Sequence, residues 1–155
     1  MLQALDSMQL MPGADEVAEL LDSNAIPRGL ITRNVLDSVH HFHRKFFSHR
    51  PFDPALARCF TPFKPSPAAL VHICERWGIS PREAVMVGDS AKDDIVSGNA
   101  AGAMTVLIDV ERKYDLGTLP ADQQPDVHVH SMAEVLQVLQ DRCQLLGADS
   151  CEAAD

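Results

Sequence analysis

The strongest indication of the fold of this chain is the stretch Val85-Met86-Val87-Gly88-Asp89-Ser90-Ala91-Lys92-Asp93-Asp94. An apolar run stops at a glycine, and acidic residues follow at once. This order is typical of a buried strand that ends in a metal-binding loop. Asp89 offers the hard oxygen ligand that Mg²⁺ prefers, while Asp93 or Asp94 can orient the water shell of the ion or cap the following helix.

Two other segments carry groups that suit the same site. Leu30-Ile31-Thr32-Arg33-Asn34 ends a short apolar run in a hydroxyl group, and Phe63-Lys64-Pro65-Ser66-Pro67 places a lysine just before a helix start. A phosphoryl oxygen is stabilised by hydrogen-bond donors and positive charge. A hydroxyl, a lysine and an acidic loop therefore predict a site for a phosphate and a divalent cation.

Helical and strand patterns alternate along the whole chain. We expect helices at 12–22, 34–49, 66–77, 93–101 and 131–145, and strands at 29–32, 57–61, 84–87, 104–108 and 127–129. This alternation predicts an α/β fold, with a parallel Rossmann-like sheet covered by helices on both faces. Ligands of such sheets bind at the carboxyl ends of the strands, where Thr32, Lys64 and Asp89 are expected.

Composition narrows the classes of partner and compartment. The chain of 155 residues is long enough for one domain, and its net charge of -9 argues against nucleic acid or an anionic membrane as a partner. Its four cysteines form no CxxC pair, which favours a reduced, intracellular and by default cytoplasmic protein. Residues 1–6 lack the basic region of a signal peptide. Targeting to an organelle remains an alternative if the N-terminus is truncated. The sequence does not predict the oligomeric state.

These segments together resemble the haloacid dehalogenase-like hydrolase superfamily, whose members are mostly phosphatases that form an aspartyl-phosphate intermediate. The resemblance extends from about Pro12 to Ile108. Residues 29–34 look like its second motif, residues 63–67 like its third, and residues 87–94 like its fourth.

The resemblance implies a Mg²⁺-dependent phosphatase of a small phosphorylated metabolite. It implies catalytic roles for Lys64 and Thr32. Asp89 becomes the expected metal ligand. Counting back from Ala101-Gly102 favours Asp94 over Asp93 as the second acid. The implied phosphate-binding residues are Thr32, Arg33, Asn34 and Lys64.

One family motif is missing from the sequence. The family's first motif is an apolar strand that ends in Asp-x-Asp, and its first aspartate is the nucleophile, but the sequence contains no Asp-x-Asp. Asp6 is only a weak candidate for the missing nucleophile. We therefore expect an N-terminally shortened chain, with residues 1–11 as a remnant of a cap insertion, 12–147 as the core domain and 148–155 as a disordered acidic tail.

The missing strand has structural and functional consequences. In the family's sheet it lies between the strands of the second and fourth motifs, so the strands at 29–32 and 84–87 should have unpaired edges. We expect an inactive and marginally stable chain. The alternative is a non-catalytic module that binds phosphate or fills its sheet with a partner's strand.

Histidines invite a separate, zinc-binding interpretation. His40, His41, His43 and His49 lack a completing set of cysteine or carboxylate ligands, which favours a solvated helix face. His128 and His130 alternate with valines and are expected on the exposed side of a strand.

Overall fold

The computed structural model describes residues 7–142, and it has the alternating α/β architecture that the sequence predicts. In chain order its helices and strands are α2 Ala14–Ser23, β1 Leu30–Ile31, α3 Leu36–Phe46, β2 Ala55–Leu56, α4 Ala68–Trp77, β3 Val85–Gly88, α5 Val96–Ala101, β4 Met104–Ile108, β5 Val127–Val129 and α6 Met132–Arg142. Asp6 and the tail 148–155 lie outside the described residues. No helix within 7–142 has the length and apolarity needed to span a bilayer.

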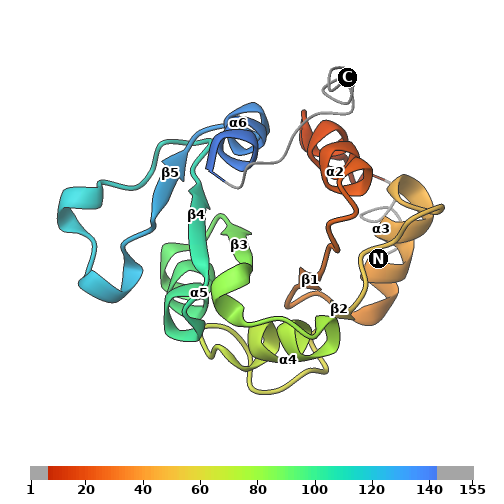
Figure 1. Ribbon diagram of the computed structural model, residues 1–155, viewed down its shortest axis with the longest axis horizontal. Coiled ribbons are helices and arrows are strands. Elements are labelled where there is room, and N and C mark those ends of the chain that lie inside the picture. The colour runs from red at the N-terminus through yellow and green to blue at the C-terminus, as the bar shows by residue number, and fades with distance from the viewer. Residues whose placement is uncertain (1–6, 143–155) are drawn as a thin grey trace, which may run out of the picture.

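The strands form two parallel sheets instead of one. β1 pairs with β2, and a second sheet has the order β3-β4-β5. Figure 1 shows β3, β4 and β5 to the left of the centre and β1 and β2 to the right of it, with α4 below both sheets. Within residues 7–142, β3 is paired along one edge only, and Val87 on this strand is 37% exposed. The expectation of an unpaired edge at this strand is therefore met in the described part of the chain.

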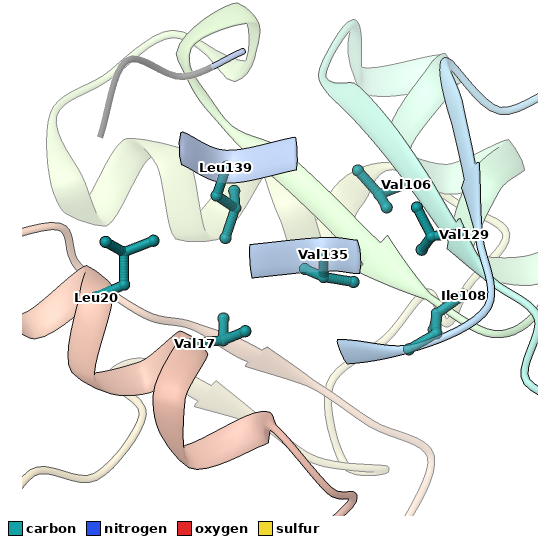
Figure 2. Packing of buried hydrophobic residues seen from close by; sticks show 7 residues of the cluster. All are labelled: Val17, Leu20, Val106, Ile108, Val129, Val135 and Leu139. Carbon is teal, nitrogen blue, oxygen red and sulfur yellow. The ribbon is translucent and has the colours of Figure 1, made fainter. Parts of the chain in front are cut away.

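Helices cover both faces of the three-stranded sheet because its side chains alternate in direction. On one face β4 and β5 pack against α2 and α6 (Figure 2), in a cluster of Val17, Leu20, Val106, Ile108, Val129, Val135 and Leu139. On the other face Leu107 packs against Ala91 and Ile95, and Met86 packs against Leu70 and Cys74 of α4. Each fully buried aliphatic side chain contributes about 1.5–3 kcal/mol. This packing fixes the strand ends that carry the site.

Some local predictions are wrong. The second strand lies at Ala55–Leu56 and not at 57–61, because the amides of Leu30 and Thr32 donate to the carbonyls of Pro54 and Leu56 and so set the register. The predicted helix at 34–49 begins later, because Asn34 does not cap α3. Its amide donates to the Thr32 hydroxyl in the turn after β1, and Val35 takes the cap position.

The helix after β3 also begins earlier than predicted. Its first turn is a π-helix at Ala91–Ile95 and precedes α5. His128 and His130 are half-buried and not exposed.

An aromatic cluster holds α3 against the loop before β2. Phe42, Phe46, Phe47 and Phe52 lie ring to ring, and the His43 ring stacks on Phe52 with centroids 6.1 Å apart. The Arg28 guanidinium lies 4.7 Å from the Phe52 ring centroid and pairs with Asp22. The predicted solvated face of α3 therefore holds only in part, since His41 and His43 are half-buried.

This cluster predicts a loss of stability on acidification. Burial lowers the pKa of His43 from its ordinary 6.5, and the charges of His40 and Arg28 lower it further. The unfolded chain then binds more protons, so the free energy of unfolding falls as the pH drops below about 6.5. Urea titrations at pH 7.5 and pH 5 should show a smaller difference for His43→Phe than for the wild type. His49→Gln removes an exposed histidine and should keep the wild-type difference; an unchanged difference in His43→Phe would contradict the prediction.

Candidate functional site

Thr32 lies at the carboxyl end of β1, as the parallel topology requires. Its amide donates to the Leu56 carbonyl at 2.9 Å, which ties the residue to β2. Its hydroxyl oxygen accepts the Asn34 amide at 3.1 Å, so the hydroxyl proton stays available for an anion. Arg33 and Asn34 follow in an exposed turn.

Lys64 joins the ends of the two sheets. It comes from the loop between β2 and α4, and its ammonium lies 3.3 Å from the Ile31 carbonyl and 2.5 Å from Asp94 Oδ1. Its side chain is 13% exposed, against 6% for Asp94. The positive charge is therefore held at the carboxyl ends of β1 and β3 in a largely buried position.

The π-turn after β3 directs two adjacent acids to two different partners. Asp94 and Ile95 both donate their amides to the Ser90 carbonyl, at 2.8 and 3.2 Å, which accommodates an extra residue in the turn. Asp94 reaches Lys64 and also accepts the Ser90 amide at 3.1 Å. Asp93 pairs with Arg33. Both acids thus contact residues from the other two predicted motifs.

Asp89 is exposed, and its carboxylate makes no hydrogen bond or ion pair with any residue in 7–142. Its backbone is fixed instead. The Asp89 carbonyl accepts the Tyr114 hydroxyl at 3.2 Å, and the same hydroxyl accepts the Ala91 amide at 3.2 Å. The loop is thus anchored at its main chain while the carboxylate oxygens stay available for a hard cation.

A small hollow lies beside these groups. Thr32, Arg33 and Lys64 line it together with apolar walls that include Ile31 and Phe60. The structure therefore brings together three of the four predicted phosphate-binding residues. Neither Asn34 nor Asp89 lines the hollow, and Asp89 is linked to it along the chain through Asp94.

The sequence did not predict a role for Tyr114 or for Asp109, which holds the Tyr114 loop in place. Tyr114 lies in the polar loop that follows β4, and its amide donates to Asp109 Oδ2 at 3.0 Å. Burial alone would raise the pKa of Asp109, but the amides of Tyr114 and Lys113 and the contact with His128 outweigh burial and lower it. No periodicity or motif marks these residues, because their contact with the Asp89 loop depends on how β3 and β4 pair.

Comparisons with known proteins agree with the fold and with the motifs. The haloacid dehalogenase-like hydrolase family pattern matches residues 1–102. The chain is 45% identical over 139 residues to a haloacid dehalogenase-like hydrolase domain-containing protein of Arabidopsis thaliana, covering 89% of this chain and 56% of that protein. It is 29% identical over 132 residues to a phosphoglycolate phosphatase of Haemophilus influenzae, covering 84% and 58%.

A solved structure gives the same result. The crystal structure of a predicted phosphoglycolate phosphatase from Haemophilus somnus matches with a TM-score of 0.75 at 25% identity, covering 89% of this chain and 61% of that one. The chain spans somewhat more than half the length of the curated relatives that it matches. The family pattern, the relatives and the α/β fold together establish that this chain belongs to the haloacid dehalogenase-like hydrolase family.

Proposed function

We propose that this chain carries the phosphate-binding and magnesium-binding part of a phosphatase site for small phosphate monoesters. The position of Lys64 supports this proposal most strongly. Its ammonium contacts the end of β1 and the Asp94 carboxylate, next to the hollow that Thr32 lines. A largely buried cation at converging strand ends suits a phosphoryl group, whose charge it can neutralise.

Each predicted site residue then has a role. Thr32 and Lys64 hold the phosphoryl oxygens as the catalytic binding groups, and Arg33 and Asn34 flank them. Asp89 holds Mg²⁺. Its exposed and unpaired carboxylate fits an ion that binds one or two carboxylates and keeps several waters. Asp94 orients Lys64 and the loop amides, with Asp93 as the alternative acid.

The attacking carboxylate is not among these residues. Covalent phosphoryl transfer in this family needs an aspartate nucleophile, and the sequence contains no Asp-x-Asp. We propose that the chain as printed binds phosphate and Mg²⁺ without hydrolysing esters. When bound, Mg²⁺ supplies positive charge to the transferring group. The printed names of relatives such as the Haemophilus influenzae protein favour a small anionic monoester as the substrate class.

A non-catalytic interaction module is the second candidate. This candidate is supported by β3, one edge of which is unpaired within residues 7–142 and which carries the exposed Val87. Such an edge can accept an added strand from a partner chain. The two functions differ in the sequence of the added strand. A strand that ends in Asp-x-Asp would also supply a nucleophile.

Titration of the isotope-labelled chain tests the proposed site. MgCl₂ should shift the amide resonances of residues 88–94, and inorganic phosphate those of residues 32–34. Asp89→Asn should weaken Mg²⁺ binding at least about tenfold, because it removes the only charged ligand that the proposal assigns to the ion. Asp122→Asn, an exposed acid elsewhere, should leave the affinity unchanged. Equal affinities in wild type and Asp89→Asn would overturn the metal assignment.

Complementation separates the two functions. The chain alone should not turn over p-nitrophenyl phosphate. A short apolar peptide ending in Asp-x-Asp should bind and restore Mg²⁺-dependent turnover, while the same peptide ending in Asn-x-Asn should bind without turnover. Binding of both peptides with no turnover favours the module. Mg²⁺-dependent turnover by the chain alone, lost in Asp89→Asn, shows that the chain is a complete enzyme.

A further inference from the structure

A second cluster of ligand-type side chains lies at the carboxyl ends of β4 and β5. Asp109 follows β4, His128 belongs to β5 and His130 follows it. The register pairs Ile108 with Val129, so Asp109 stands beside His130, and His128 points to the same face two residues earlier. One ligand atom from each of the three residues lies within 4.8 Å of the other two.

The carboxylate of this cluster is held in place before any ligand arrives. Asp109 is 1% exposed, and its oxygens accept the amides of Lys113 and Tyr114 at 2.9 and 3.0 Å. These donors, with His128, keep its pKa below the usual range despite burial. An ionised carboxylate that is fixed in a poorly solvated position attracts a cation more strongly than an exposed one.

His130 is oriented as a metal-ligating histidine is, and His128 lies against the carboxylate of the same cluster. His130 Nδ1 lies 2.9 Å from the Asp109 carbonyl, and donation to it leaves the lone pair on Nε2. His128 Nε2 lies 3.2 Å from Asp109 Oδ2, and the two imidazole centroids are 4.7 Å apart. Hydrogen bonding of the second ring nitrogen to a backbone carbonyl is the usual support of a ligating histidine.

We propose that Asp109, His128 and His130 form a binding site for Zn²⁺ or a similar transition-metal ion. Two imidazoles and one carboxylate suit Zn²⁺ and leave a fourth position open, whereas Mg²⁺ prefers oxygen ligands only. Tetrahedral zinc ligands stand about 3.3–3.5 Å apart, so small rotations of the imidazole rings close the site around the ion. The site is separate from Asp89 and does not depend on the proposed phosphatase function.

Metal titration of the whole chain tests this proposal. Calorimetry with ZnCl₂ should show a saturable site, and Co²⁺ should give the visible absorption of a tetrahedral ion. His128→Gln and His130→Gln should each weaken Zn²⁺ binding at least about tenfold, because each removes a ligand from a three-ligand set. Excess MgCl₂ should not displace the ion.

Matched variants exclude other zinc ligands. His40→Gln/His49→Gln removes two exposed histidines elsewhere and should keep full affinity. If His128→Gln fails to fold by circular dichroism, His130→Gln carries the test, since within the described residues the ring of His130 hydrogen-bonds to a backbone carbonyl and to no side chain. Undiminished affinity in a folded His130→Gln variant, or a thiolate-to-cobalt charge-transfer band, would overturn the proposal.

Discussion

Replacement of Lys64 by methionine is expected to abolish phosphate binding and to destabilise the fold. The ammonium is the only cation in contact with Asp94 within the described residues, and both side chains are largely buried. Removing one partner of a buried ion pair leaves a charge without compensation, which costs about 3 kcal/mol. Urea unfolding should show this loss, and phosphate titration should show no saturation.

A second substitution separates the two effects. In Lys64→Met/Asp94→Asn the stranded charge is gone, so most of the stability should return while phosphate binding stays lost. Lys92→Met removes an exposed lysine from the same turn and should change neither quantity. Wild-type phosphate affinity in Lys64→Met would show that the anion does not bind beside this ammonium.

The regular core could be predicted from the sequence because its signals are local. The strands at Met104–Ile108 and Val127–Val129 have the bounds that were predicted, since apolar runs and turn residues mark both ends. Helix α4 ends at Trp77, and the following Gly78 adopts the left-handed conformation that is typical of a glycine after a helix. The parallel α/β class follows from the alternation of such segments and is confirmed by the sheet pairing.

Features that depend on pairing between distant segments could not be predicted. Residues 57–61 look no less strand-like than Ala55–Leu56, and only the hydrogen bonds to β1 select the latter. Asp93 and Asp94 compete for one role in the sequence, but the π-turn gives each a different basic partner. The contact of Tyr114 with the Asp89 carbonyl likewise exists only once β3 and β4 are side by side.

Among the site residues, local sequence likewise predicted the identities but not the contacts between distant segments. Local sequence was sufficient to propose Thr32 at the end of an apolar run, Lys64 just before a helix start and Asp94 by its spacing from Ala101-Gly102. It did not show that Lys64 would touch both β1 and the π-turn. The alternation of His128 and His130 with valines predicted an exposed face, although the pairing of β4 with β5 brings both against Asp109. The assignments to phosphate and Mg²⁺ stay predictions until binding is measured.

Gly88→Ala is expected to disrupt the magnesium end of the proposed site. A Cβ atom at position 88 would lie 2.2 Å from Asp94 Oδ2 and 2.4 Å from its Cβ, so the Asp94 side chain and its turn must move. Crowding of this kind costs about 1–3 kcal/mol. The displacement breaks the contacts of Asp94 with Lys64 and the Ser90 amide, and Mg²⁺ affinity at the neighbouring Asp89 should fall at least about tenfold, in line with the loss of a supporting contact around a metal site.

Gly78→Ala provides a control of similar cost without the steric contact. Its φ of +69° makes alanine unfavourable by about 1 kcal/mol, but among the described residues no atom beyond the two chain neighbours of Gly78 lies within 4 Å of the added Cβ. Both variants should therefore lower the free energy of unfolding, while only Gly88→Ala should lose Mg²⁺ binding in the amide titration. If the two variants bound Mg²⁺ equally well, the close approach of Asp94 to Gly88 would serve packing alone, and the metal end of the proposed site would have to be formed without Asp94.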